Sequence, residues 1–309
     1  MIWRHIANWL GAGAPCCLVT VREARGSTPR EAGARMAIGL DNSYTGTIGG
    51  GALEWEAMAV ARNLIARHSE GYGTERTFAL GPALAQCCGG SVILRFEVFA
   101  PGDLDWIAAL ARTEEAGSFT TEGEPDARRV VIRRLALPAA SPVAEQETHG
   151  TAKRDVLLFG AGHVGRALVL ALAPLPFTVH WIDNRQGVFP SSLPRNAMIV
   201  SAVDPKSIAR EYNSSGIAVV ATHSHALDLE IVAGLLKNKS FQFIGLIGSE
   251  TKRNRFISRL QEIGFDKSAT ARLICPIGIP GVHGKEPAVI AASVAAQLLM
   301  LPRAISAPD

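Results

Sequence analysis

Residues 156–165 read Val156-Leu-Leu-Phe-Gly-Ala-Gly-His-Val-Gly165, and the helix-forming run Arg166-Ala-Leu-Val-Leu-Ala-Leu172 follows them. The residues before the first glycine are continuously apolar, as in a central parallel strand that is covered on both faces. No helix breaker follows until Pro174. The stretch therefore predicts a buried strand, a glycine turn and a helix, which is the order that opens a Rossmann-type unit.

Each glycine of this turn has its own role in the dinucleotide fingerprint. Gly160 makes the tight turn, Gly162 lets the backbone approach a pyrophosphate, and Gly165 lets the helix pack on the strand. The helix that starts near His163 offers unpaired N–H groups to an anion. Asp183 ends the next apolar run and supplies the acidic residue that the fingerprint places about 20 residues later. We predict cofactor contacts at these five residues, although a fold can outlast its original ligand.

The composition indicates a globular protein of about two domains, with 309 residues, 48% hydrophobic residues, 30 glycines and 17 prolines. A net charge of +3 from 31 basic and 28 acidic residues is too balanced for a dedicated nucleic-acid surface. Apolar runs are interrupted before the ~20 residues that a membrane span requires, and no leader pattern opens the chain. We expect a cytoplasmic protein with no nucleic-acid or membrane partner.

The five cysteines include two adjacent pairs, which have poor geometry for ordinary disulfides: Cys16, Cys17, Cys87, Cys88 and Cys275. We interpret Cys16, Cys17 and Cys275 as core residues. Cys87 and Cys88 lie in the loop Gln86-Cys-Cys-Gly-Gly90, where thiols are placed for soft-metal or sulfur chemistry. Both are candidate sulfur or metal contacts, and Gln86 is a candidate hydrogen-bonding partner. The alternative is that the two thiols only fill space under the loop.

A basic turn, Arg25-Gly-Ser-Thr-Pro-Arg30, follows the apolar strand predicted at residues 16–21. Arg25 and Arg30, with Arg35 beyond them, supply three guanidinium groups, and Ser27 and Thr28 supply two hydroxyls. Such groups can converge on a phosphate or a carboxylate. The alternative is a solvated basic turn.

Three consecutive glycines stand at the start of a strong helical run, in Thr47-Ile-Gly-Gly-Gly51. Glycines at a helix start can form a backbone nest that binds an anion, or they can serve close packing. We favour a ligand site at Thr47, Gly49, Gly50 and Gly51.

Further strands are predicted at residues 197–200, 217–221 and 241–247. His223 and His225 follow the second of these, at the carboxyl end of a parallel strand, where ligands bind in this architecture. We expect them to donate to a bound ligand from the start of a helix. A plain helix cap, and a metal-dependent hydrolase site completed by Asp228, are the alternatives.

Cations in the first turn of a helix oppose its dipole, and Lys252 follows Ser249 at such a position. A bound phosphate would offset the charge, and otherwise the side chain reaches solvent. Lys285 stands before the last helix, at the end of a glycine-proline loop. We predict ligand contacts at Ser249, Lys252 and Lys285. The last helix is apolar, so we expect a homodimer.

Residues 138–151 show no apolar periodicity and are rich in polar and turn-forming residues, which is typical of a linker. The chain is therefore predicted to contain an α+β domain at 1–137, a linker at 138–152, and a Rossmann-type, doubly wound α/β domain at 153–309.

Seven motifs spread over nearly the whole chain resemble the XdhC/CoxI family of xanthine dehydrogenase accessory proteins. They are Arg25-Gly-Ser-Thr-Pro-Arg-Glu-Ala-Gly-Ala-Arg-Met36, Gly46-Thr-Ile-Gly-Gly-Gly-Ala-Leu-Glu54, Gln86-Cys-Cys-Gly-Gly90, Phe159-Gly-Ala-Gly-His-Val-Gly165, Thr222-His-Ser-His-Ala-Leu-Asp-Leu-Glu230, Gly245-Leu-Ile-Gly-Ser249 with Thr251-Lys-Arg253, and Pro276-Ile-Gly-Ile-Pro-Gly281 with Gly284-Lys-Glu-Pro287. Residues 118–152 carry no family signal.

This resemblance implies a protein that binds the molybdenum cofactor (molybdopterin) as cargo, helps it acquire a sulfido ligand and delivers it to xanthine dehydrogenase or a related molybdenum hydroxylase. A cysteine desulfurase is a further possible partner. Such a role needs no turnover of its own. The alternative from the residues is an NAD(P)-dependent oxidoreductase that uses the glycine turn and Asp183.

Overall fold

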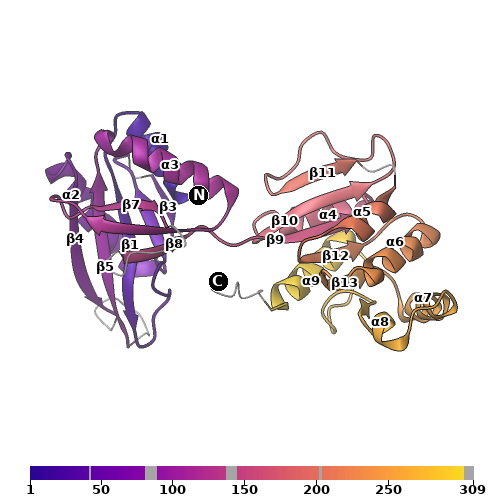
Figure 1. The fold of residues 1–309 in the computed structure, drawn as a ribbon. Coiled ribbons are helices and arrows are strands. Elements are labelled where there is room, and N and C mark those ends of the chain that lie inside the picture. The colour runs from indigo at the N-terminus through magenta and orange to yellow at the C-terminus, as the bar shows by residue number, and fades with distance from the viewer. Residues whose placement is uncertain (42, 81–88, 137–144, 202–203, 303–309) are drawn as a thin grey trace. The chain divides into compact units, whose positions relative to one another are not determined.

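The computed structural model describes the chain except residues 42, 81–88, 137–144, 202–203 and 303–309 (Figure 1). It divides into two compact units, Met1–Ala152 and Lys153–Asp309. Among the described helices, none has both the length and the apolar character that crossing a bilayer requires.

The first unit is an α+β domain. Its elements are α1 (Ile2–Gly11), β1 (Cys16–Arg25), β2 (Arg35–Ile38), β3 (Tyr44–Gly46), α2 (Gly51–Arg67), β4 (Tyr72–Ala79), β5 (Ser91–Phe99), the short 3-10 turn η2 (Pro101–Asp103), α3 (Leu104–Ala116), β6 (Phe119–Pro125), β7 (Val131–Leu135) and β8 (Glu145–His149). An antiparallel five-stranded sheet has the order β3-β2-β1-β5-β4, and a second sheet has the order β7-β6-β8.

The five-stranded sheet is buried on both faces because successive side chains of β1 point in opposite directions. Cys17 and Val19 pack in the core beneath α2, whereas Cys16 and Leu18 pack with residues of α1 and α3. The prediction that Cys16 and Cys17 are core residues is confirmed, since both are fully buried. The adjacent thiols therefore belong to two different cores.

The linker prediction for residues 138–152 is wrong in its second half. Residues Glu145–His149 form strand β8, which pairs with β6 in the three-stranded sheet of the first unit. The inward-facing residues of β8 are Glu147 and His149, and both are buried. The strand has no apolar alternation because its buried positions are polar, and the sequence pattern therefore did not reveal it.

The second unit is a doubly wound α/β domain. Its elements are β9 (Arg154–Phe159), α4 (His163–Leu172), β10 (Phe177–Asp183), β11 (Ala197–Ser201), α5 (Pro205–Glu211), β12 (Gly216–Val220), α6 (His225–Lys237), β13 (Phe241–Leu246), α7 (Glu250–Glu262), α8 (Lys267–Ala271), β14 (Leu273–Ile274) and α9 (Pro287–Met300). All pairings in its six-stranded sheet are parallel, and the strand order is β11-β10-β9-β12-β13-β14. This is the Rossmann order, which confirms the predicted fold class.

The strand order reverses between β9 and β12, which makes the carboxyl ends of these strands the expected place for a ligand. Leu157 and Phe159 of β9 face the core shared with α5, α6 and α7, while Val156 and Leu158 face the core shared with α4 and α9. Helices on both faces explain why residues 156–159 are apolar without alternation.

Candidate functional site

The three glycines after β9 differ in what surrounds them. Gly160 has φ +116°, and a Cβ there would collide with the carbonyl oxygen of Ala221 after β12. A Cβ on Gly165 would collide with the carbonyl oxygen of Gly160. Gly162 has φ −75° at the N-cap of α4, and a Cβ there would meet no heavy atom within 4 Å. The outer glycines therefore serve close packing, whereas Gly162 exposes its backbone to open space.

Asp183 ends β10, and its carboxylate is almost fully buried behind the glycine turn. Oδ2 accepts hydrogen bonds from the Ala161 amide at 2.7 Å and from Arg185 Nη2 at 2.8 Å. Oδ1 accepts from the Arg185 amide at 3.0 Å and from Arg185 Nε at 2.9 Å. Burial raises the pKa of Asp183, but these hydrogen bonds outweigh it and bring the pKa down to about 2. Asp183 thus holds the turn in place as an anion with four donors.

The His223 side chain is exposed beside the glycine turn. A small hollow at the switch point is lined by Gly160, Asp183, Thr222 and His223, so the structure brings these predicted residues together. His163 and His225 are exposed first residues of α4 and α6. The cap of α6 is Ser224, whose Oγ accepts from the Leu227 amide at 3.4 Å.

Lys252 neither faces solvent nor stands free for a phosphate. Its Nζ lies 2.7 Å from Asp228 Oδ2 and 2.9 Å from the Ile247 carbonyl oxygen. Asp228 Oδ1 also accepts from the Thr222 hydroxyl at 2.7 Å, and Asp228 is 1% exposed. The prediction of a phosphate partner for Lys252 overlooked this carboxylate, which lies 24 residues earlier in the chain. The same pair occupies Asp228, the residue considered as a third metal ligand with His223 and His225.

Ser249 and Lys285 line one cavity of about 630 Å³ at the carboxyl edge of the Rossmann sheet. Its other walls come from the loop at residues 276–282 and from Val289 and Ile290 of α9. Ser249 also caps α7, because its Oγ accepts from the Lys252 amide at 3.3 Å. Two predicted residues that are 36 positions apart are thus brought to the same cavity.

In the first unit, the basic turn at residues 25–30 lies against two other motifs. A Cβ on Gly26 would stand 3.2 Å from Cα of Gly90, at the end of the cysteine loop. A Cβ on Gly49 would collide with the ring of Pro29. The three motifs predicted to carry function in this unit therefore meet at this turn.

The side chains of the basic turn itself are mostly solvated. Arg25 is 72% exposed and pairs with Glu23 at 2.7 Å. The Thr28 hydroxyl donates to the Arg30 carbonyl oxygen at 3.1 Å, while Ser27 and Arg30 are exposed. The described contacts match the solvated turn more closely than a preassembled anion site.

The glycine nest before α2 already contains an anion, the carboxylate of Glu54. Glu54 Oε1 accepts from the amides of Ile48 at 2.9 Å, Gly49 at 3.2 Å and Gly50 at 2.9 Å, and also from the Thr47 hydroxyl. Burial raises the pKa of Glu54, but these hydrogen bonds outweigh it and lower the pKa. The prediction of an external ligand at Thr47, Gly49, Gly50 and Gly51 missed this internal carboxylate. Gly51 itself is exposed as the first residue of α2.

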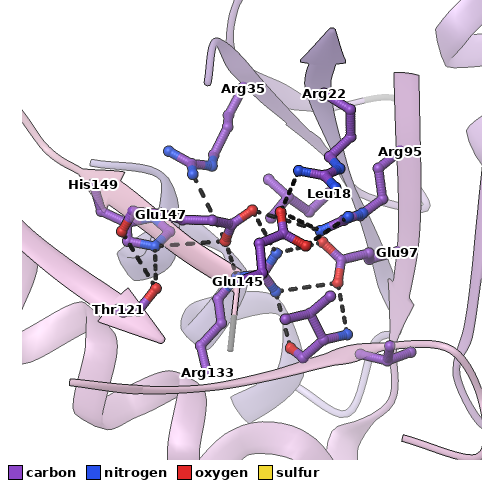
Figure 2. Close-up of polar contacts among 12 residues, drawn as sticks. Leu18, Arg22, Arg35, Arg95, Glu97, Thr121, Arg133, Glu145, Glu147 and His149 are labelled. Carbon is purple, nitrogen blue, oxygen red and sulfur yellow. Dashed lines mark hydrogen bonds and ion pairs between the residues drawn. The ribbon is translucent and has the colours of Figure 1, made fainter. Parts of the chain in front are cut away.

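Arg35 is held away from the basic turn by a buried ionic network between the two sheets (Figure 2). Its Nη1 donates to the Thr148 carbonyl oxygen at 2.9 Å, and its Nη2 lies 3.8 Å from Glu147 Oε2. Arg133, with no exposed side-chain surface, donates to Glu97 Oε2 at 2.7 Å and also pairs with Glu147. Charged residues two positions apart, as in Arg95-Phe-Glu97, share one face of a strand, which was the available sequence signal.

His149 is the neutral end of this network. Burial and the nearby Arg35 lower the pKa of His149 to about 3. Trp3 Nε1 donates to His149 Nδ1 at 3.1 Å, and His149 Nε2 lies 2.7 Å from the Thr121 hydroxyl. This network joins α1, β6 and β8 within the first unit, so it acts on the fold of the unit.

Gln86, Cys87 and Cys88 lie outside the described residues. The described cysteines, Cys16, Cys17 and Cys275, are buried, and burial raises the pKa of each thiol. The interpretation of Cys275 as a core residue is confirmed. Reactivity at Cys87 and Cys88 stays a prediction.

Family models match both units. The XdhC Rossmann domain matches residues 156–298, and the XdhC and CoxI family matches residues 9–76. This chain belongs to the XdhC and CoxI family.

Relatives of this XdhC chain include the molybdenum cofactor insertion chaperone PaoD of Escherichia coli K12, 21% identical over 90% of this chain and 81% of PaoD. A probable xanthine dehydrogenase component of Bacillus subtilis 168 is 23% identical over 91% of this chain and 92% of that protein. The uncharacterised protein YqeB of E. coli K12 is 24% identical over 97% of this chain, which spans only 46% of YqeB. A crystal structure described as a xanthine dehydrogenase from Bacillus halodurans superposes with a TM-score of 0.74 at 21% identity, covering 97% of this chain and 95% of that one. This likeness concerns the fold.

The XdhC Rossmann domain offers two kinds of binding group at its carboxyl edge. One is the open backbone at Gly162, and the other is the cavity next to Ser249 and Lys285. Within the described part of the chain, no group of three His, Cys, Asp or Glu side chains gathers as metal ligands. The arrangement is suited to holding an anionic organic molecule.

Proposed function

We propose that this chain binds the molybdenum cofactor, assists its sulfuration and inserts it into xanthine dehydrogenase or a related molybdenum hydroxylase. Membership of the XdhC and CoxI family and the likeness to the insertion chaperone PaoD support this proposal. A cysteine desulfurase as the sulfur source and a homodimer as the working assembly belong to the same proposal. The cofactor is cargo, so the chain needs no chemical turnover.

The observation that carries the proposal is the open glycine at the switch point. Gly162 caps a ten-residue helix and has free space where its side chain would be. The first N–H groups of a helix and its positive dipole favour a phosphate. Molybdopterin carries a phosphate, and this turn is suited to receive it.

The Rossmann strand order also favours an NAD(P)-dependent oxidoreductase as a second candidate. That activity would need Asp183 to accept hydrogen bonds from a ribose. An ionised carboxylate has about four lone-pair sites, and Ala161 and Arg185 already use four. A ribose would have to displace Arg185, so the geometry favours the chaperone.

The test is to purify the full chain from cells that make molybdopterin and to measure bound pterin, molybdenum and nicotinamide. We expect pterin in the wild type and a loss of pterin in Gly162→Val with an unchanged melting temperature. Gly102→Val is the matched control, because Gly102 has equally open surroundings in the first unit. Nicotinamide in place of pterin would instead support the oxidoreductase.

A further inference from the structure

The cavity between the end of β13 and the start of α9 has the size and lining of a small-molecule site. Its volume of about 630 Å³ falls within the 300–1,000 Å³ typical of ligand pockets. Aliphatic side chains form its walls, among them Ile277, Ile279 and Val289. Ser249, Glu250 and Lys285 add a few polar groups. Apolar walls with few polar groups are characteristic of sites for planar organic ligands.

The loop that forms this cavity is anchored to the helix behind it. The Gly278 amide donates to Gln297 Oε1 at 2.7 Å, and the Ile279 amide donates to Ser293 Oγ at 2.7 Å. Gly278 has φ +111°, and a Cβ there would stand 2.7 Å from Ser293 Oγ. Ser293 is only 8% exposed. The cavity is therefore a built feature of the unit.

The cavity lies at the same sheet edge as the glycine turn. β12 separates β9 from β13, so the carboxyl ends of β9 and β13 are about 10 Å apart at the usual strand spacing. Helices α4 and α9 pack in one core on the same face of the sheet, and each follows a strand, so both begin at this edge. One ligand can reach both places.

Glu250 gives the cavity a specific preference. It is the first residue of α7, its side chain is 71% exposed, and its ion pair with Arg253 is long at 4.0 Å. A carboxylate can accept two parallel hydrogen bonds from adjacent N–H donors. The amino-pyrimidinone edge of a pterin presents such a pair of donors.

We propose that this cavity holds the pterin ring system, with the ring between Ile277 and Val289 and its donor edge on Glu250. This inference rests on the proposed function and places the cargo within it. The phosphate of the same molecule then lies on the turn at Gly162, and Lys285 stands at the cavity as a second cation for the anionic arm.

Two variants of the full chain test the placement. Val289→Trp fills the cavity, and Ala288→Trp is its control, because Ala288 is the exposed neighbouring residue of α9. Glu250→Gln removes the charged acceptor, and Glu262→Gln is its control at the exposed far end of α7. Molybdopterin that copurifies with each protein is oxidised and quantified by fluorescence, and melting temperatures are compared.

We expect Val289→Trp and Glu250→Gln each to retain at least about tenfold less pterin than their controls, as loss of a charge-assisted hydrogen bond or of the binding volume predicts. If both variants retain pterin like the controls, the placement is wrong while the proposed function stands. If the wild type carries no pterin, both fail. If Val289→Trp does not fold, Glu250→Gln decides the outcome.

Discussion

Asp183 illustrates how the partners of a single residue determine its role. It stands where the dinucleotide fingerprint places a ribose acceptor, yet its oxygens accept from the Ala161 amide and from Arg185. The carboxylate therefore stabilises the glycine turn by orienting its backbone. Loss of the charge should act first on stability.

Asp183→Asn should lower the free energy of unfolding at neutral pH by up to about 2 kcal/mol, from the difference between the ordinary and folded pKa values. The folded pKa of Asp183 is about 2, below its ordinary value of 3.8, so the carboxylate stabilises the fold above about pH 4. This contribution is lost as the pH falls from about 4 towards 2. Urea unfolding across this range should show the wild type and the variant converging in acid, whereas a pH-independent difference would exclude the linkage.

The start of α2 shows how a backbone nest can be filled from within one element. Glu54, in the first turn of the helix, binds the amides of residues 48–50 that precede it. The positive φ angles of Gly49, Gly50 and Gly51 turn the backbone so that its amides converge on this carboxylate. The glycines are therefore required by an internal contact.

Glu54→Ala should destabilise the protein by about 1–3 kcal/mol, because it leaves several buried donors without an acceptor. Added sulfate or phosphate should then raise the melting temperature of the variant more than that of the wild type. Glu56→Ala is the control, since Glu56 is exposed on the same helix. An equal response of all three proteins to the anions would contradict an open nest.

The packing of β8 against the five-stranded sheet depends on charge pairs. Arg133 and Glu97 have no exposed side-chain surface, and Glu147 is 7% exposed. Burying ions requires partners for all of them, so the network commits β5, β7 and β8 to one arrangement (Figure 2).

Arg133→Met should lower the free energy of unfolding by about 3–5 kcal/mol, because it leaves the Glu97 and Glu147 carboxylates buried without their main cation. Arg25→Ala removes an exposed pair and should cost less than about 1 kcal/mol. Chemical denaturation of the three proteins measures both values. A similar small effect of the two changes would show that the network contributes little.

For the molecule as a whole, the motifs are divided between two units, one α+β and one Rossmann-type. The second unit contains the open glycine turn and the cavity, whereas the cysteine loop belongs to the first. A chaperone must both hold its cargo and hand it over in active form. We therefore expect variants that retain the cargo but fail to activate the target.

The double variant Cys87→Ser, Cys88→Ser should keep the fold and much of its pterin, yet fail to support activation of a co-expressed molybdenum hydroxylase. A thiolate can act as a soft ligand or as a sulfur carrier, and a hydroxyl cannot replace it in either role. Cys275→Ala is the control, because burial raises the pKa of that thiol. Full activation by the double variant would assign the sulfur chemistry to a partner.

The sequence alone determined the elements whose signals are local. The apolar run before Gly160, the helix formers after Gly165 and the acid at 183 follow one another within 30 residues, so chain order was enough to predict the Rossmann-type unit. The core positions of Cys16 and Cys17 could be predicted for the same reason, since both lie in one apolar strand.

Only the tertiary structure decided which charged groups are free. Lys252 meets Asp228 from the preceding helix, Arg35 meets Glu147 from a strand that lacks apolar alternation, and Asp183 faces the turn at Ala161. These partners are separated in sequence by 24, 112 and 22 residues. A motif shows which groups a ligand could use, but a buried charge binds whichever opposite charge or donor the packing brings closest, and no local pattern records that neighbour.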